Sequence, residues 1–263
     1  MLRDLPYARR GEVDLLADVY RPASTEAAPA VLLVHGGSWA RGSRLRMAQI
    51  ASAVAKHGFV AVNIEYRLAP EHPYPASLED VLAAVCWVRR NAVRLGVDPQ
   101  RIALWGYSAG GHLSALAGSR PEATNPGDAC AADIARVQAC VIGSAPTDLR
   151  RFGDIGPVRE FLGGRPAEIP AVVEAASPVF AVHSESPPTF LYHGRDDWVV
   201  GVEHSRALRN ALVAANVPVQ LIETARGHLT QLVCPKETIV EALAFLDRWL
   251  APLPVVEKGR EDP

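Results

Sequence analysis

The chain has 263 residues, of which 49% are hydrophobic and 21% charged, and its formal net charge at pH 7 is −2. Such a chain can bury a large core, so the composition excludes extensive disorder and predicts one globular domain. The balance of 27 basic and 29 acidic residues argues against a nucleic-acid-binding surface or a polybasic membrane patch. No secretory signal or membrane-spanning run is recognisable, and we therefore expect a cytoplasmic protein.

Short apolar runs alternate with longer amphipathic segments along the chain. The first run, Glu12–Arg21, alternates polar and apolar residues and predicts an antiparallel edge strand. The next runs are almost continuously apolar, as in strands covered on both faces. They are Ala30–His35, Phe59–Ile64, Arg101–Trp105, Gln138–Gly143, Thr189–His193 and Pro218–Glu223.

The segments between these strands predict helices. They are Arg44–His57, Ser77–Leu95, Ala109–Ser119, Glu203–Ala215 and Glu237–Leu250. Ser77 followed by Asp80 resembles a capping box at the start of the second helix. Alternating strands and helices predict an α/β fold with a mostly parallel, doubly wound sheet and helices on both faces.

Two segments interrupt this alternation. Pro121–Asp133 is polar and predicts a loop. Ser144–Pro188 is too long for a plain connection and contains many Pro and Gly residues, which favours a small cap or lid within a single domain spanning residues 1–263. The Pro-rich tail from Ala251 is expected to fray.

The four cysteines are far apart in the sequence and form no CxxC pair, which argues against a zinc ribbon or a thioredoxin-type site. Cys86 and Cys140 lie in apolar runs and are interpreted as small buried hydrophobic residues, whereas Cys130 could pair with another cysteine. The histidines show no metal-ligand spacing, and no nucleotide-binding glycine motif is present. We therefore expect neither a metal nor an organic cofactor.

The strongest chemical signal is a GxSxG pentapeptide at residues 106–110, between a predicted strand and a predicted helix. This is the setting of a nucleophile elbow, in which a sharp turn presents a reactive serine. Ser108 is therefore the candidate nucleophile, and the alternative interpretation is a glycine-rich turn with a surface serine. A second motif, HGGSW at 35–39, follows the first buried strand. The backbone N–H groups of Gly36, Gly37 and Ala109 are candidates for an oxyanion hole.

A serine nucleophile also needs a base and an acid, which follow it in the order acid, then histidine, in this type of site. His228, in a loop after the last predicted strand, is the candidate base, whereas His204 is interpreted as a helix-surface residue. Asp197 is the preferred acid because it follows a strand end and precedes a new helix. Asp196 is its main rival and Asp148 a more distant one.

Taken together, the motifs resemble those of α/β-hydrolase esterases of the hormone-sensitive-lipase-like group, and most closely the bacterial feruloyl-esterase-like carboxylesterases. The matching segments are HGGSW (35–39), EYRLAPEHPYPASLEDV (65–81), DPQRIALWGYSAGGHLSAL (98–116), SPPTFLYHGRDDWVV (186–200) and GH (227–228). The resemblance implies an α/β-hydrolase fold, a triad of Ser108, Asp197 and His228, and the oxyanion donors named above.

Three features depart from that group. Only 34 residues precede His35, which leaves no room for an N-terminal helical cap and favours an open, shallow cleft. Ser38 replaces a third glycine of the oxyanion loop, and Trp198 replaces the commoner proline after the acid. We expect Trp39 and Trp198 to contact the substrate.

The leading functional hypothesis is a serine carboxylester hydrolase that cleaves short-chain acyl or small aromatic esters through an acyl-enzyme. The first alternative is an amide hydrolase such as an arylformamidase, acting with the same triad. A non-catalytic binding module on a hydrolase fold is the second. The expected partner is a small ester, and an exposed last strand could support a homodimer.

Overall fold

The computed structural model describes residues 1–24, 26–120, 135–232 and 236–252. The predictions for Pro121–Asp133, for Cys130 and for most of the tail lie outside these residues. None of the helices in the described ranges combines the length and the hydropathy that a membrane crossing requires.

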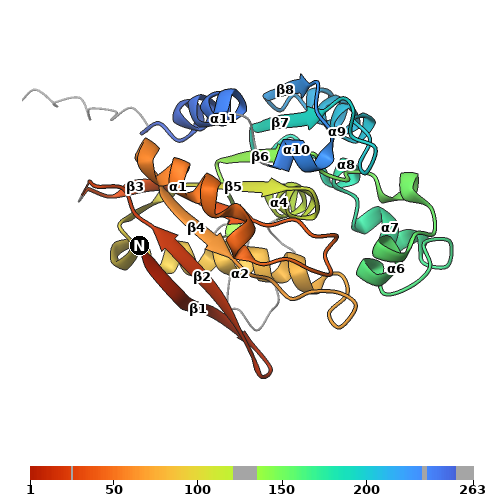
Figure 1. Ribbon diagram of the computed structural model, residues 1–263, viewed down its shortest axis with the longest axis horizontal. Coiled ribbons are helices and arrows are strands. Elements are labelled where there is room, and N and C mark those ends of the chain that lie inside the picture. The colour runs from red at the N-terminus through yellow and green to blue at the C-terminus, as the bar shows by residue number, and fades with distance from the viewer. Residues whose placement is uncertain (25, 121–134, 233–235, 253–263) are drawn as a thin grey trace, which may run out of the picture.

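One eight-stranded sheet organises the structure, with the strand order β1-β2-β4-β3-β5-β6-β7-β8 (Figure 1). The first two strands pair antiparallel to each other, and β2 pairs antiparallel to β4, whereas all other pairs are parallel. The strands are β1 (Leu2–Arg10), β2 (Val13–Tyr20), β3 (Ala28–Val34), β4 (Val60–Ile64), β5 (Val97–Tyr107), β6 (Ala139–Gly143), β7 (Thr189–Gly194) and β8 (Val219–Thr224). The predicted mostly parallel α/β sheet is confirmed.

The edge of the sheet differs from the prediction. Glu12–Arg21 was expected to form the edge strand, but β2 is covered by β1, which becomes the edge. The sequence of β1, LRDLPYARR, contains four charged residues and a proline, and only Tyr7 is buried. Such a strand carries a weak hydrophobic signal because its apolar side chains other than Tyr7 are only partly buried, and proline is tolerated at a sheet edge.

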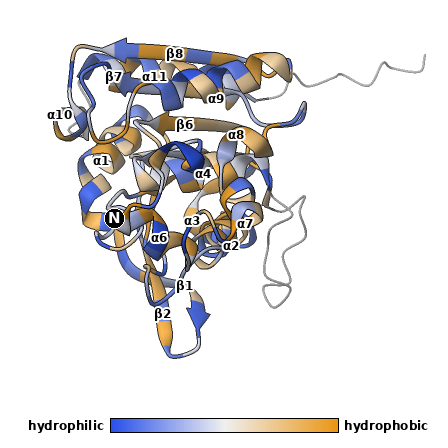
Figure 2. Cartoon of the chain, turned by 90° about the vertical axis from the view of Figure 1, so that its right-hand side faces the viewer, coloured by the Kyte–Doolittle hydropathy of each residue, from blue (hydrophilic) through white to orange (hydrophobic). Residues whose placement is uncertain are grey.

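Helices cover both faces of the sheet, and the central strands are buried accordingly. In β3, Val31 and Leu33 pack on the side of α1 (Ala48–His57) and α11 (Lys236–Trp249). Leu32 and Val34 pack on the opposite side, with α2 (Ala76–Arg90) and α4 (Ala109–Ser119). All four side chains are fully buried, and β6 is likewise hydrophobic along its length (Figure 2). The continuous apolar runs in the sequence therefore reflect burial from both sides.

The second predicted helix is wrong in two details. It breaks at Asn91, where the side-chain amide donates a hydrogen bond to the Trp87 carbonyl, so that α3 (Ala92–Leu95) is a separate turn. The helix also begins at Ala76 behind Pro75, and Ser77 makes no capping bond. The expected partner in the capping box, Asp80, is fully buried and instead accepts hydrogen bonds from Arg67.

The other predicted helices agree more closely with the structure. The predicted helix Arg44–His57 begins as a 3-10 turn, η1 (Arg44–Met47), and α9 (Glu203–Ala214) and α11 agree within one residue at each end. The cysteines agree in part, because Cys86 and Cys140 are both buried. Cys140 is free, but Cys86 is disulfide-bonded and therefore more than a small hydrophobic residue.

The segment from residue 144 to 188 contains one 3-10 turn and three short helices. They are η3 (Leu149–Phe152), α6 (Gly156–Leu162), α7 (Pro170–Ala175) and α8 (Pro178–Ala181). Figure 1 shows α6 and α7 beyond the carboxyl end of β5, where the candidate site lies.

Candidate active site

Ser108 lies in the turn between β5 and α4 and has a strained backbone. Its φ of 54° and ψ of −123° are uncommon for a residue other than glycine. The Ser108 N–H donates to the Gly143 carbonyl at 2.8 Å, which ties the turn to β6. A Cβ on Gly106 would lie 2.1 Å from the Gly110 oxygen, and one on Gly110 would lie 2.1 Å from the Val34 oxygen. A side chain at either position would therefore force the backbone of the turn to shift.

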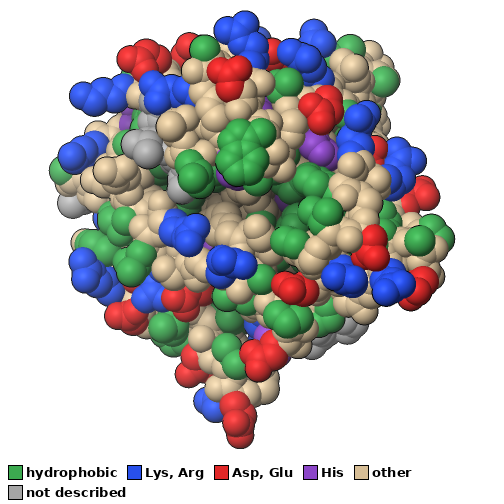
Figure 3. All heavy atoms as spheres, turned by 45° about the vertical axis from the view of Figure 1, so that its right-hand side comes forward, with side chains coloured by type: hydrophobic (Ala, Val, Ile, Leu, Met, Phe, Trp, Pro, Cys, Tyr) green, Lys and Arg blue, Asp and Glu red, His purple; other side chains and the backbone are tan. Residues whose placement is uncertain are grey.

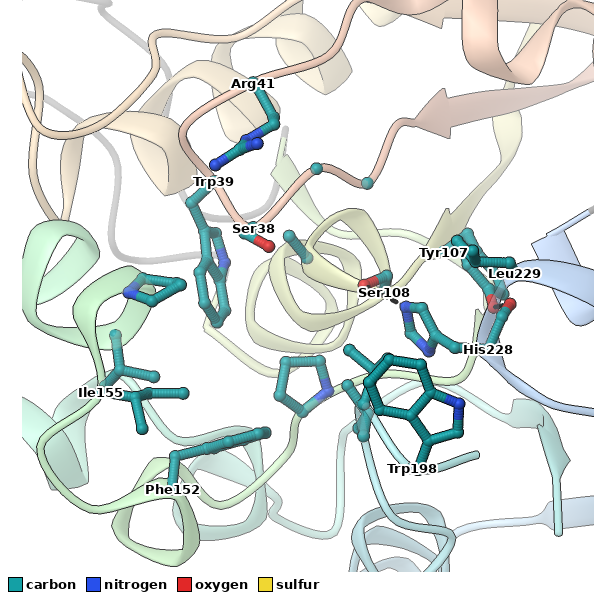
Figure 4. Close-up of a pocket in the computed structure, with 18 of the residues that line it drawn as sticks. Ser38, Trp39, Arg41, Tyr107, Ser108, Phe152, Ile155, Trp198, His228 and Leu229 are labelled. Atoms are coloured by element: carbon teal, nitrogen blue, oxygen red, sulfur yellow. Dashed lines mark hydrogen bonds between the residues drawn. The ribbon is translucent and has the colours of Figure 1, made fainter. Parts of the chain in front are cut away.

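Three side chains from separate elements form one hydrogen-bonded chain at the carboxyl ends of the strands. His228 Nε2 lies 3.0 Å from Ser108 Oγ, and His228 Nδ1 lies 2.7 Å from Asp197 Oδ2. The serine follows β5, the aspartate follows β7, and the histidine begins α10 (His228–Leu232) after β8. Figure 4 shows the imidazole beside the serine hydroxyl. In this geometry His228 can take the serine proton at Nε2 while its Nδ1–H donates to the Asp197 carboxylate.

The two rival acids lie elsewhere. Asp196 is exposed to solvent, and its backbone N–H donates to the Arg226 carbonyl. Asp148 caps η3 and holds the guanidinium of Arg150 with distances of 2.9 and 2.8 Å. The structure therefore brings Asp197, and neither rival, to His228.

The Asp197 carboxylate is buried but well supplied with donors. Its Oδ1 accepts from the backbone N–H groups of Val199 and Val200 at 3.0 and 2.8 Å. Burial raises the pKa of Asp197, but hydrogen bonds from His193 and His228 and from the Val200 N–H outweigh it and lower the pKa below its ordinary value. The acid is therefore ionised at neutral pH and able to accept from the imidazole.

His193 also belongs to this site, although no sequence motif points to it. It is fully buried at the end of β7, and its Nε2 lies 2.7 Å from the Val200 carbonyl and 3.4 Å from Asp197 Oδ2. Its Nδ1 lies 2.7 Å from Ser205 Oγ. The bond to a carbonyl places the proton on Nε2, so the ring holds the loop that carries Asp197. The available signal was a histidine at the end of an otherwise apolar strand.

The candidate oxyanion loop follows β3 and packs directly on the serine turn. A Cβ on Gly36 would lie 2.8 Å from the Tyr107 oxygen and 3.1 Å from Ser108 Cβ. Gly37 has a φ of +137°, and a Cβ there would lie 1.8 Å from the Arg41 oxygen. Gly36, Gly37 and Ala109 line the same cavity as the serine. The two glycines are therefore required by the close approach of backbone to backbone.

Trp39 is fixed at the cavity wall by polar and aromatic contacts. Its indole N–H donates to His112 Nδ1 at 3.1 Å, and its ring stacks on Phe161 with centroids 4.5 Å apart. His112 Nε2 in turn donates to the Ala176 carbonyl at 2.7 Å. Burial lowers the pKa of His112 to about 4, so the neutral ring can accept from the indole. Trp198, in contrast, is 86% exposed.

His204 was interpreted as a helix-surface residue, and this prediction is wrong. Only 2% of it is exposed, because it lies on the face of α9 that also carries Leu208 and Leu212. Its Nδ1 accepts from the Thr147 N–H at 3.2 Å, and its ring stacks on Phe152. A histidine on the buried stripe of a helix is easily mistaken for a polar surface residue.

A cavity of about 400 Å³ opens above Ser108, and its walls are mostly apolar. Figure 4 shows Trp39 and Phe152 on one side of the serine and Trp198 on another. On the surface, hydrophobic side chains border a hollow, with Lys or Arg side chains at one edge (Figure 3). The side chains lining the cavity are those of Ser38, Trp39, Arg41, Arg46, Tyr107, Ser108, Ala109, Pro146, Phe152, Ile155, Pro157, Val158, Trp198, Val199, Val200, His228 and Leu229.

Known proteins resemble this chain in sequence and in structure. The sequence profile of the BD-FAE family matches residues 17–212. Esterase LipQ of Mycobacterium tuberculosis is 36% identical over 237 residues, which cover 86% of this chain and 56% of that protein. Esterase LipC of the same organism is 34% identical, covering 76% of this chain and 53% of that protein. The chain thus spans about half the length of these curated relatives.

Solved structures match over almost the whole chain. A truncated carbohydrate esterase from gut microbiota superposes with a TM-score of 0.86 and 25% identity, covering 95% of this chain and 96% of that one. Esterase 2 of Thermogutta terrifontis, phosphoramylated by tabun, superposes with a TM-score of 0.81 and 28% identity over the same shares. The same esterase is also known with propionate bound. Together with the sheet topology, these matches establish the α/β-hydrolase fold.

Proposed function

The chain belongs to the BD-FAE family, and from this premise we propose that it is a serine carboxylester hydrolase acting through an acyl-enzyme. The observation that carries the proposal is the hydrogen-bonded chain of Ser108, His228 and Asp197 in the wall of an apolar cavity. The esterase names of the curated relatives and the tabun adduct of the Thermogutta enzyme support it.

In the proposed reaction, Ser108 Oγ attacks the ester carbonyl while His228 Nε2 takes the hydroxyl proton. The backbone N–H groups of Gly36, Gly37 and Ala109 stabilise the negative oxygen of the tetrahedral intermediate. The imidazolium then protonates the leaving alcohol, which leaves the acyl group on the serine. Water repeats the sequence with His228 again as base, and releases the acid.

Asp197 assists this proton transfer by holding one tautomer of the imidazole. Because its carboxylate is ionised and accepts from Nδ1–H, Nε2 is left without a proton and can act as the base. The carboxylate also stabilises the imidazolium that forms. It keeps its own charge throughout the cycle.

The proposed substrates are short-chain acyl or small aromatic esters. A cavity of about 400 Å³ fits ligands of this size, and the propionate complex of the Thermogutta esterase is a supporting example. Trp39 and Trp198 are the proposed substrate contacts. The segment from 144 to 188 acts in this proposal as a small cap, since Phe152, Ile155 and Val158 line the cavity.

The decisive experiment is covalent labelling with a fluorescent organophosphonate, followed by peptide mapping. We expect one adduct on Ser108 in the folded protein and none in the Ser108→Ala variant, which should also lose ester hydrolysis by several orders of magnitude. The variant should bind substrate and unfold like the unaltered chain. Undiminished turnover by a clean Ser108→Ala preparation would refute the assignment, and an absence of labelling would favour a binding module.

Two further predictions belong to this proposal. The outer edge of β8 pairs with no strand of the described residues, so a homodimer could form by pairing two copies of β8, which light scattering would detect. A cytoplasmic location is also proposed. The disulfide at Cys86 argues against it, because such bonds persist mainly in oxidising compartments. Cell fractionation tests the location, and recovery of the protein outside the cytoplasm would contradict the proposal.

A further inference from the structure

Three arginines follow the candidate oxyanion loop within six residues, and they differ in their surroundings. Arg44 is largely buried and forms ion pairs with three carboxylates, those of Asp4, Asp18 and Glu65. Arg41 and Arg46, on either side of it, are both exposed. These three carboxylates are thus already paired with Arg44.

Among the described residues, neither exposed guanidinium has an acidic partner of its own. In residues 1–24, 26–120, 135–232 and 236–252, no carboxylate lies within 4.0 Å of the Arg41 or Arg46 guanidinium, whereas such pairs hold Arg44 and Arg67. Both arginines nevertheless line the cavity above Ser108. No aspartate or glutamate is found among the described residues that line it.

The backbone fixes where Arg41 stands relative to the reacting atoms. Its N–H donates to the Gly37 carbonyl at 3.1 Å, and its Cγ is the nearest side-chain atom to the space a Gly37 Cβ would fill. The side chain therefore starts directly beside the candidate oxyanion loop. Figure 4 shows it across the cavity from Trp198, and Lys or Arg side chains border the hollow in Figure 3.

From this placement we propose that the preferred substrates are esters that carry a carboxylate or a similar anion, bound by Arg41 and Arg46. This inference rests on the proposed esterase function and names its substrate class. Guanidinium groups bind carboxylates through paired hydrogen bonds, and two cations with no internal acid attract an anion into an apolar cavity. The reaction is ordinary hydrolysis, in which water and a monoester of a dicarboxylic acid give the dicarboxylate, the alcohol and a proton.

The test compares pairs of esters that differ only in charge. Ethyl hydrogen succinate carries the anion on the acyl side, and ethyl succinamate is its neutral isostere. The matched pair 3-acetoxypropanoate and 3-acetoxypropanamide carries the difference on the alcohol side. The quantity to measure by pH-stat titration is the ratio of kcat/KM for the anionic ester to that for its neutral partner, in the unaltered chain, Arg41→Gln, Arg46→Gln and the double variant.

We expect a ratio above one for at least one pair, which also shows on which side the anion is held. The ratio should fall about fivefold to tenfold for each arginine replaced, the range for a partly exposed charge-assisted hydrogen bond. It should also fall with added salt, because the screening length shrinks from about 30 Å at 0.01 M to about 3 Å at 1 M. Arg209→Gln, which removes another exposed charge, on α9, should leave the ratio unchanged.

A ratio of one or less for both pairs, or a ratio that the double variant does not change, overturns the anion preference while leaving the esterase proposal intact. If all four esters resist hydrolysis, the proposed function itself fails. In that case, calorimetric titration of the Ser108→Ala variant with succinate and with neutral succinamide still tests anion binding. Tighter binding of succinate supports the proposal. Succinate binding that persists undiminished after both arginines are replaced counts against the proposal as well.

Discussion

At the scale of single residues, the side chains of the site are held in place by backbone conformation and hydrogen bonds. The strained backbone of Ser108 points its hydroxyl at the imidazole, and the carboxylate of Asp197 receives two backbone N–H groups besides the imidazole. Pre-organised donors of this kind cost no rearrangement when charge develops in the reaction. Catalytic losses should therefore follow the removal of single contacts.

Asn at position 197 should be far more damaging than Asn at position 196. Asp197→Asn keeps the shape of the side chain but no longer favours the imidazole tautomer that leaves Nε2 free, and the corresponding change in a triad costs on the order of 10⁴ in kcat. Asp196→Asn alters an exposed carboxylate beyond hydrogen-bond reach of His228. Steady-state kcat on one activated ester measures both variants, and the opposite ranking would show that the acid is misassigned by one residue.

His193 should act as a positioning residue for Asp197. In His193→Leu the acid loop loses the bond to the Val200 carbonyl and a donor facing the carboxylate. Loss of a hydrogen bond to a charged group predicts a fall in kcat of about tenfold to a hundredfold, with a smaller change in KM.

The matched control for that experiment is His57→Gln, at the end of α1, where the histidine pairs with Asp247 on the surface. It should leave kcat unaltered. If kcat falls equally in both variants, or if His193→Leu changes only the free energy of unfolding, then His193 contributes to packing and does not position Asp197.

At the scale of elements, the junction of β3, its following loop and α4 sets the position of the candidate oxyanion donors. A Cβ on Gly110 would meet the backbone oxygens of Val34 and His35 at 2.1 and 2.5 Å, and neither can rotate away. We expect Gly110→Ala to lower the free energy of unfolding by about 1–3 kcal/mol, the usual cost of overpacking. Denaturant unfolding measures this directly. Gly156→Ala, where nothing lies within 4 Å of the added carbon, should be close to neutral, and equal losses would contradict the steric argument.

The elements that the sequence predicted well are those whose signal is local or defined by spacing. The apolar runs reveal strands buried on both faces, and the GxSxG and HGG motifs lie at strand ends, which parallel strands bring to one edge of the sheet. What could not be predicted depends on tertiary contacts. The edge strand β1 has a single buried side chain, and Asp80 accepts hydrogen bonds from Arg67 instead of taking part in a helix cap. His193 and His204 became interpretable only once their partners were known.

At the scale of the whole molecule, the proposed catalytic residues follow strands of the sheet, and the segment from 144 to 188 supplies part of the cavity wall. Phe152, Ile155 and Val158 from this segment line the cavity together with Trp198 and Val199 from the loop after β7 and Leu229 from α10. The space between them is about 400 Å³, so an acyl chain can be buried only over a limited length. The size of the proposed substrate therefore depends on how closely these two groups of residues approach each other.

This arrangement predicts that kcat/KM peaks at short acyl chains. While an added CH₂ is buried against the walls, it contributes about 0.8 kcal/mol, or close to fourfold in kcat/KM if the gain is realised in the transition state. Once the chain extends past the cavity, further methylenes stay in water and contribute nothing, and their bulk hinders approach to Ser108. Esters of one alcohol with acyl chains from acetyl to lauroyl, assayed below their solubility limits, give the profile. A steady rise out to the longest chains, or activation at an oil–water interface, would mean that the 144–188 segment opens like a lipase lid and that the cavity is larger in solution than its present walls allow.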